Sequence, residues 1–205
     1  MKRTASVALI IGVLVVGGMA SAADKAATQM KTYVGPGGDF QFRYPAWLID
    51  CKADPNDLSC VSYMPVCDGE SYESIICIAY PKDRVKEQKT FGGAAFVVSM
   101  VQNAHDEAAC REVSSALPPQ LAHQHKETIN GVEFWVSGAG GGVAMGHSMD
   151  QQVYRAFHNN LCYELGINIS AVARTVYDPP EPKSFSQKAV EKPLRQTLRT
   201  FQFLK

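Results

Sequence analysis

Hydrophobic and polar residues alternate near the start of this chain in the manner of a β-strand with one buried face. Residues 40–44 alternate aromatic side chains with glutamine and arginine, and Pro45 ends the run. Trp47 and Leu48 follow after Ala46, and we expect both to anchor the core. Further strands are predicted at 60–64, at 74–80 and at 93–102, where valines and a glycine pair favour a strand over a helix.

From residue 125 to residue 169 the pattern is that of strands throughout. Asn130-Gly131 and Asn159-Asn160 are turn pairs typical of β-hairpins. Between them the glycine-rich stretch 138–146 is expected to be a connecting loop. In the strand 161–170 the odd-numbered apolar residues share one face, so Cys162 must point to the other face.

Two helices are predicted. The first covers 106–113, with acidic residues in its first turn. The second, at about 186–201, is amphipathic, since Val190, Leu194, Leu198 and Phe201 recur at helical spacing. Pro193 either kinks this helix or marks the first turn of its longer half.

The first 22 residues have the order of a secretory signal peptide. Lys2 and Arg3 precede the apolar run 7–16, and Ala20-Ser21-Ala22 supplies the small side chains that a signal peptidase accepts. The run is much shorter than the roughly 20 residues of a membrane span. We therefore expect cleavage after Ala22, no transmembrane segment in the mature chain, and a periplasmic or secreted location.

The cysteine content fits that location. Six cysteines in an exported chain indicate three disulfides, and the six are Cys51, Cys60, Cys67, Cys77, Cys110 and Cys162. Zinc binding is the alternative, but the chain has no Cys-x-x-Cys pair. Sequence excludes none of the fifteen possible pairings. Short loops close at the lowest entropic cost, which favours Cys51–Cys60 and Cys67–Cys77 and leaves Cys110–Cys162.

The net charge and the length of the chain limit the classes of protein to which it can belong. Removing residues 1–22 takes away two of the 20 basic residues and none of the 20 acidic ones, leaving a net charge of −2. That balance gives no bulk attraction for nucleic acid. We expect a flexible leader at 23–38, rich in small and polar residues, and one folded domain at 39–205.

Several side chains carry candidate chemistry, each with a simpler explanation. His123 and His125 lie two apart and would project from one face of a strand as metal ligands, or as ordinary surface groups. His147 and His158 are candidate bases for a hydrolase. The glycines at 138–142 lack the lysine and serine or threonine of a phosphate-binding loop, so they favour a hairpin connection.

Two oxygen-rich segments are weaker candidates. Asp50, Asp54, Asn56 and Asp57 offer calcium ligands, although their spacing is not that of an EF-hand and a surface turn explains them. Asn168-Ile169-Ser170 is a formal glycosylation triplet inside a predicted strand. We expect neither a bound cofactor nor a metal.

The C-terminal helix presents a basic stripe opposite its apolar one. The stripe consists of Lys188, Lys192, Arg195 and Arg199. It is a candidate docking surface for an acidic partner or anionic lipid, while a solvated outer face is the simpler explanation.

The layout resembles the PsbP/Mog1-like superfamily. The resemblance is carried by Phe40-x-Phe42-x-Tyr44-Pro45-x-Trp47, by the paired strands ending in Cys162-Tyr163-Glu164-Leu165, and by the terminal amphipathic helix. It implies an α+β fold over 39–205, with an antiparallel sheet of about six or seven strands covered by helices. No functional residue of the family matches a position here.

Members of that superfamily are mostly non-enzymatic, among them extrinsic photosystem subunits and periplasmic accessory proteins. The resemblance therefore implies an exported, non-enzymatic binding or accessory protein, for which an envelope protein is a candidate partner. Two alternatives stay open. One is a small extracytoplasmic hydrolase with His147 or His158 as its base, and the other is a metal or small-ligand carrier using His123 and His125.

Overall fold

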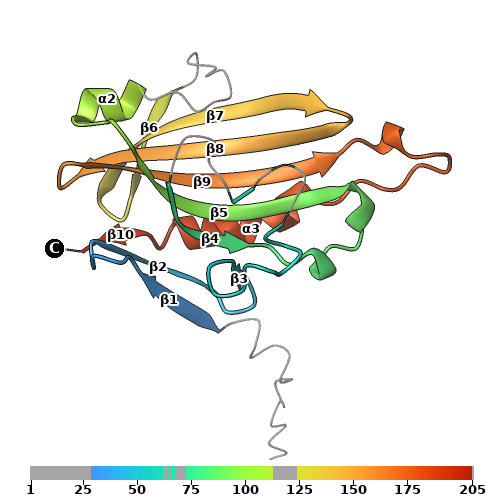
Figure 1. Cartoon of the computed structure of the whole chain (residues 1–205), viewed down its shortest axis with the longest axis horizontal. Helices are drawn as coiled ribbons and strands as arrows, with labels where there is room; N and C mark the ends of the chain where they lie inside the picture. Colours follow the sequence, from blue (N-terminus) through green and yellow to red (C-terminus); the bar gives the residue numbers. More distant parts are fainter. Residues whose placement is uncertain (1–28, 62–63, 65, 68–72, 113–123, 205) are drawn as a thin grey trace, which may run out of the picture.

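The fold is built of two antiparallel sheets and a long helix, as seen in a computed structural model (Figure 1). The structure describes residues 29–61, 64, 66–67, 73–112 and 124–204. A seven-stranded sheet forms one layer, and helix α3 (Gln187–Leu198) covers one face of it. The predicted α+β class, with a sheet of about seven strands and a C-terminal amphipathic helix, is confirmed.

The large sheet has the order β3-β4-β5-β9-β8-β7-β6. Its strands are β3 (Ile49–Asp50), β4 (Glu73–Ala79), β5 (Phe91–Val101), β6 (His125–Ile129), β7 (Val132–Ala144), β8 (His147–His158) and β9 (Leu161–Val172). The hairpin turns at Asn130-Gly131 and Asn159-Asn160 form as predicted. All four residues have positive φ values, as a type I′ turn requires.

A small sheet has the order β1-β2-β10, with β1 at Met30–Val34, β2 at Phe40–Pro45 and β10 at Gln202–Phe203. The β2 strand is the one predicted from aromatic alternation. However, β1 lies inside the segment 23–38 that we expected to be a flexible leader. Its pairing with β2 in full antiparallel register makes residues 30–34 part of the fold.

The main core lies between the large sheet, α3 and β2. Phe42, Phe96, Leu194 and Phe201 are fully buried there, and α3 packs on β2, β5 and β9. Three short 3-10 helices, η1 (Lys82–Arg84), η2 (Gln88–Thr90) and η4 (Arg174–Val176), lie in the connections. The apolar stripe predicted for the last helix is thus the stripe that faces the core.

The opposite face of the large sheet carries helix α2 (Glu107–Glu112), close to the predicted position. There the Cys110–Cys162 disulfide joins α2 to β9 in a small cluster with Val101 and Ala104. Cys162 points away from the main core, as the alternation in β9 predicts. The other two bridges, Cys51–Cys60 and Cys67–Cys77, confirm the pairing that short loops favoured.

Two local predictions need correction. The glycine-rich stretch is not a loop, because β7 continues to Ala144 and the turn is Met145-Gly146. Pairing with β8 holds these glycines extended despite their low strand propensity. No strand forms at residues 60, 61 and 64 of the strand predicted at 60–64, whose other positions lie outside the described residues.

Pro193 lies inside one continuous helix, buried against the core. Its ring replaces the N–H that would donate to the carbonyl of Ala189, so one backbone bond of α3 is missing. Within the described part of the chain, no helix has the length and apolar character to cross a membrane.

Candidate functional site: the basic face of α3 and the Trp47 groove

The basic stripe lies on the outer face of α3. Ser186 caps the helix, since its side chain accepts a hydrogen bond from the N–H of Ala189. Val190, Leu194 and Leu198 point inward, so the cationic positions half a turn away point outward. Lys188, Lys192 and Arg199 are exposed, whereas Arg195 is half-buried.

Arg195 differs from the other three cations because it is bound within the fold. Its guanidinium pairs with Glu191 one turn earlier, and its Nη1 donates to the Tyr154 hydroxyl at 3.2 Å. Burial raises the pKa of Tyr154, and the neighbouring Arg195 opposes that rise. Lys188, Lys192 and Arg199 form no ion pair with any side chain that the structure describes.

An open groove of about 550 Å³ lies between α3 and the edge of the small sheet. Its lining is mostly apolar and is formed by Met30, Pro45, Trp47, Tyr80, Arg84, Ala189, Lys192, Pro193 and Gln196. Among these described residues there are two cations and no carboxylate. Lys192 is shared with the basic stripe, so the stripe and the groove form one continuous surface.

Trp47 is the centre of this surface. The Arg84 guanidinium carbon lies 4.6 Å from the centroid of the Trp47 ring, which is a cation–π contact. Tyr80 packs edge-on against the indole, with the ring centroids 5.4 Å apart. Trp47 and Arg84 also line a second hollow beside Leu58, which is 75% exposed. We predicted Trp47 as a core anchor, but it is only partly buried.

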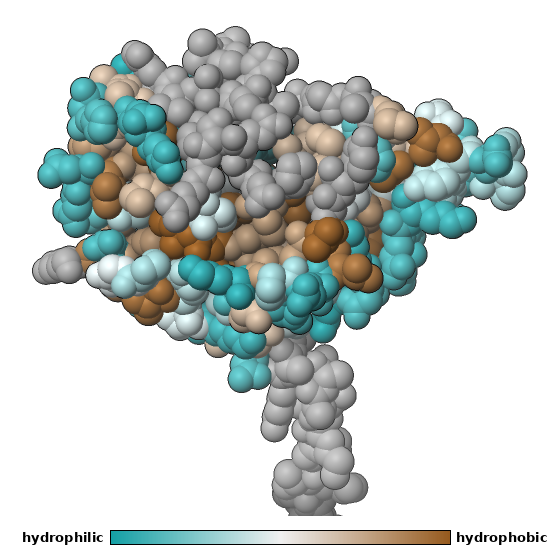
Figure 2. Space-filling view, in the orientation of Figure 1, coloured by the Kyte–Doolittle hydropathy of each residue, from teal (hydrophilic) through white to brown (hydrophobic). Residues whose placement is uncertain are grey.

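Apolar surface elsewhere is dispersed. In the coloured parts of the view in Figure 2, hydrophobic side chains reach the surface in separate patches among hydrophilic ones. Scattered patches of this kind are normal for a folded domain. The Trp47 groove with the adjoining stripe combines cations with an apolar floor, and its chemistry suits an anionic partner that also carries apolar groups. Trp135 also carries two cations over its ring, Arg111 and Lys126, but Lys126 is paired with Glu133.

Among the described residues, the candidate histidines are not brought together. His125 lies exposed on β6, and His123 lies outside the described residues. His147 opens β8, while His158 ends that strand. The His158 ring stacks on Phe203 with centroids 4.0 Å apart, and its Nε2 is buried without a hydrogen-bond partner.

The oxygen-rich turn at residues 50–57 is held by its own backbone. Asp50 accepts hydrogen bonds from the N–H groups of Lys52 and Ala53, and Asp57 accepts one from Ser59. These are turn-capping contacts. Among the described side chains, one group of three possible metal ligands lies close together: Cys51, Cys67 and Cys77. Two of them are bonded to each other.

The glycosylation triplet is inaccessible. Asn168 is 3% exposed in the middle of β9, and its Nδ2 donates to the carbonyl of Val66 at 2.8 Å. This asparagine therefore anchors the segment around Val66 to the back of the sheet.

Sequence reasoning found the stripe but missed the groove. Trp47 lies between β2 and β3, Arg84 in η1 and Lys192 in α3, and these three distant positions line one groove in the folded chain. The signal available beforehand was an aromatic residue two positions after a strand-ending proline, which is a common position for an exposed turn.

No family model and no curated protein matches this sequence. Solved structures do resemble it at low identity. A protein from Bacteroides thetaiotaomicron VPI-5482 is 14% identical with a TM-score of 0.46, over 85% of this chain and 48% of that one. The present chain thus spans about half the length of the Bacteroides protein. Cyanobacterial PsbP from Synechocystis sp. PCC 6803 is 9% identical with a TM-score of 0.40, over 91% of this chain and 98% of that one.

Proposed function

We propose that this chain is an exported, non-enzymatic binding or accessory protein that docks an acidic partner, such as an envelope protein, on the basic face of α3 and the Trp47 groove. The signal-peptide pattern at residues 1–22 supports export. Three disulfides are typical of proteins that work in an oxidising compartment.

One observation carries the proposal. Lys188, Lys192 and Arg199 are exposed and make no ion pair with the described residues, while the groove beside them adds Arg84 and an aromatic floor. Clustered cations steer an acidic partner and fix its register. Aromatic and arginine side chains are the residue types that contribute most to binding energy at interfaces.

The experiment is affinity capture from the organism's own envelope with three versions of the exported protein. The first is the wild type and the second is Lys188→Glu/Lys192→Glu/Arg199→Glu. The third, Lys86→Glu/Lys89→Glu/Lys183→Glu, applies the same charge change to exposed lysines that belong to neither the stripe nor the lining of the groove. We expect the stripe variant to lose at least about tenfold in captured partner, as rim charges act through long-range attraction.

The control variant should retain the partner, and raising the salt concentration should weaken capture by the wild type. Equal capture by the stripe variant and the wild type would contradict the proposal. A second arm uses vesicles of phosphatidylglycerol and of phosphatidylcholine. Binding to the anionic vesicles alone, with no protein captured, would reassign the stripe to a lipid surface.

A hydrolase is the second candidate, because of one observation at His158. His158 lines a hollow of about 440 Å³ together with Glu107 and Glu133, and its buried Nε2 has no hydrogen-bond partner among the described residues. A base needs a substrate proton within hydrogen-bond reach. Turnover of chromogenic esters, phosphates or glycosides that disappears in His158→Ala would support this candidate, and its absence would leave the binding role.

The carrier alternative is tested separately by calorimetry with zinc, copper and calcium. Heat that is lost in His125→Ala would support a metal site on β6. No heat with any of the three ions would remove it.

A further inference from the structure

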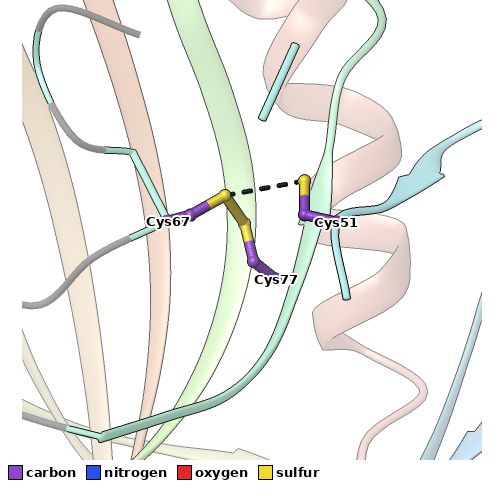
Figure 3. Close-up of side chains that lie close together, drawn as sticks. All are labelled: Cys51, Cys67 and Cys77. Carbon is purple, nitrogen blue, oxygen red and sulfur yellow. Dashed lines mark hydrogen bonds between the residues drawn. A yellow bond between two sulfur atoms is a disulfide. The ribbon is translucent and has the colours of Figure 1, made fainter. Parts of the chain in front are cut away.

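Two disulfides lie side by side at the β3–β4 edge of the large sheet. Cys51 is bonded to Cys60, and Cys67 is bonded to Cys77. The Sγ atom of Cys51 nevertheless lies only 3.7 Å from the Sγ atom of Cys67, as the dashed line in Figure 3 marks. The sulfurs of Cys51, Cys67 and Cys77 all fall within 4.8 Å of one another. A sulfur of one bridge is therefore in contact distance of the other bridge.

The backbone, and not only the bridges, holds Cys51 in this position. Ile49 and Asp50 pair with Ala79 and Ile78 in antiparallel register. The N–H of Cys51 continues this ladder by donating to the carbonyl of Cys77 at 3.0 Å. Cys51 thus remains opposite Cys77 when its bond to Cys60 is broken.

The two bridges differ in access. The loop between Cys51 and Cys60 is largely exposed, and Cys51 itself is half-buried. In the second bridge Cys67 is also half-buried, but Cys77 is 6% exposed and packs with Val66, Ala95 and Val97 behind the sheet. A reductant from solution therefore reaches Cys51–Cys60 before it reaches Cys77.

From this geometry we propose that the two bridges form a thiol–disulfide exchange site for a dithiol reductant. The dithiol gives two electrons to Cys51–Cys60, becomes a disulfide itself, and leaves Cys51 and Cys60 as thiols. The Cys51 thiolate then attacks Sγ of Cys67. The Cys51–Cys67 bond forms, the Cys67–Cys77 bond breaks, and Cys77 leaves as a thiolate that takes up a proton.

This step has one chemical requirement and one structural requirement. The attacking species is the thiolate, so exchange becomes faster as pH rises through the ordinary range of a thiol. Attack along the axis of a disulfide needs rotation of the Cys51 side chain, and loss of the bond to Cys60 releases that rotation. Reduction of the more accessible Cys51–Cys60 bridge thereby produces a free thiol at the buried Cys77.

The test compares two variants that each leave one free thiol in the same bridge. Cys60→Ser frees Cys51, whereas Cys51→Ser frees Cys60, which is not part of the close group of three sulfurs. Both are incubated at about pH 8.5, near the ordinary thiol pKa. They are then quenched in acid, unfolded, alkylated and mapped by peptide mass spectrometry. Because neighbouring groups react at high effective concentration, we expect label at Cys77 to be about tenfold higher in Cys60→Ser than in Cys51→Ser.

Label confined to Cys51 in Cys60→Ser would overturn the proposal, as would label shared by Cys51 and Cys67 with Cys77 unlabelled. An intact Cys110–Cys162 bridge and an unchanged circular dichroism spectrum show that each variant is folded. The wild type provides an independent measurement. After limited reduction with dithiothreitol, Cys60 and Cys77 should be the first thiols labelled together, and labelling of Cys51 with Cys60 instead contradicts the relay.

Discussion

Arg155 and Glu164 stand directly opposite each other on β8 and β9, and both are about 5% exposed. The Nε and Nη2 atoms of Arg155 each lie 2.8 Å from the same carboxylate oxygen of Glu164. The pair lies on the face of the sheet away from α3. It is a buried charge pair whose two members depend on each other, because either one alone would be an uncompensated charge.

Removing one member of this pair should lower the free energy of unfolding much more than replacing both members with apolar residues. We expect Glu164→Ala to lower the free energy of unfolding by about 3–5 kcal/mol, because it leaves Arg155 charged and buried. The double variant Arg155→Met/Glu164→Met should lose less than Glu164→Ala alone. Urea denaturation of the two variants and the wild type measures both values, and a double variant that is less stable than the single one would contradict the account.

The same pair predicts a pH dependence. Burial raises the pKa of Glu164 above its ordinary value of 4.5, although Arg155 acts in the opposite direction. A raised carboxyl pKa means that the folded state binds the proton more tightly, so this contribution to stability is full below pH 4.5 and decreases as pH rises through the folded value. The stability of the wild type relative to Glu164→Gln should therefore fall between acidic and neutral pH. Denaturation curves across that range test the sign.

The long-range bridge should stabilise the fold more than a local one. Cys110–Cys162 closes a loop with a sequence separation of 52, compared with 9 for Cys51–Cys60. The chain-entropy relation predicts a loss of about 4 kcal/mol for Cys110→Ala/Cys162→Ala and about 3 kcal/mol for Cys51→Ala/Cys60→Ala. Chemical denaturation of the two double variants provides the comparison. Equal or reversed losses would show that native-state packing, and not loop closure, sets the order.

Asn130 connects a hairpin turn to the end of α3. Its Nδ2 donates to the carbonyls of Arg199 and Phe201 at 2.8 and 2.9 Å. Asn130→Gly keeps the positive φ value but loses both bonds, so we expect a cost of about 1–3 kcal/mol. Asn159→Gly is the matched control at the other turn, also at positive φ, and should stay within about 0.5 kcal/mol of the wild type. Thermal and urea unfolding measure both, and similar losses in the two variants would contradict the anchoring role.

Within the basic stripe, we expect Arg195 to stabilise the fold and the other three cations to contribute little to stability. Arg195→Ala removes contacts with Glu191 and Tyr154, so we expect it to destabilise the fold by about 1–2 kcal/mol. Lys188→Ala, Lys192→Ala and Arg199→Ala should each change stability by less than about 0.5 kcal/mol. Unfolding measurements on the four single variants test this division. A large loss in any of the last three would show that it has a structural partner.

Local signals predicted most of the sheet, and their success has identifiable reasons. The alternation in β9 placed Cys162 on the face opposite Tyr163, since strand side chains alternate strictly. Loop length selected the cysteine pairing, because short loops close at the lowest entropic cost. The strands β1 and β10 were missed because neither has a clear pattern. β1 is mostly exposed, and β10 has two residues.

The features that the sequence did not predict depend on contacts between residues far apart in the chain. The glycines of β7 are typical of a loop in sequence, but pairing with β8 provides the hydrogen bonds that keep them extended. The Trp47 groove needs three segments that only the finished fold brings together. The different role of Arg195 within its stripe depends on Tyr154 across the core, which helical spacing alone does not reveal.

The central position of β2 has a consequence for the order of folding. One edge of β2 pairs with β1 and the other with β10, and the Thr200 side chain bonds to the backbone of Arg43, 157 residues earlier. A nascent chain therefore cannot complete this sheet until its last strand has been synthesised. A fusion placed directly after Phe203 therefore tests how late this sheet closes.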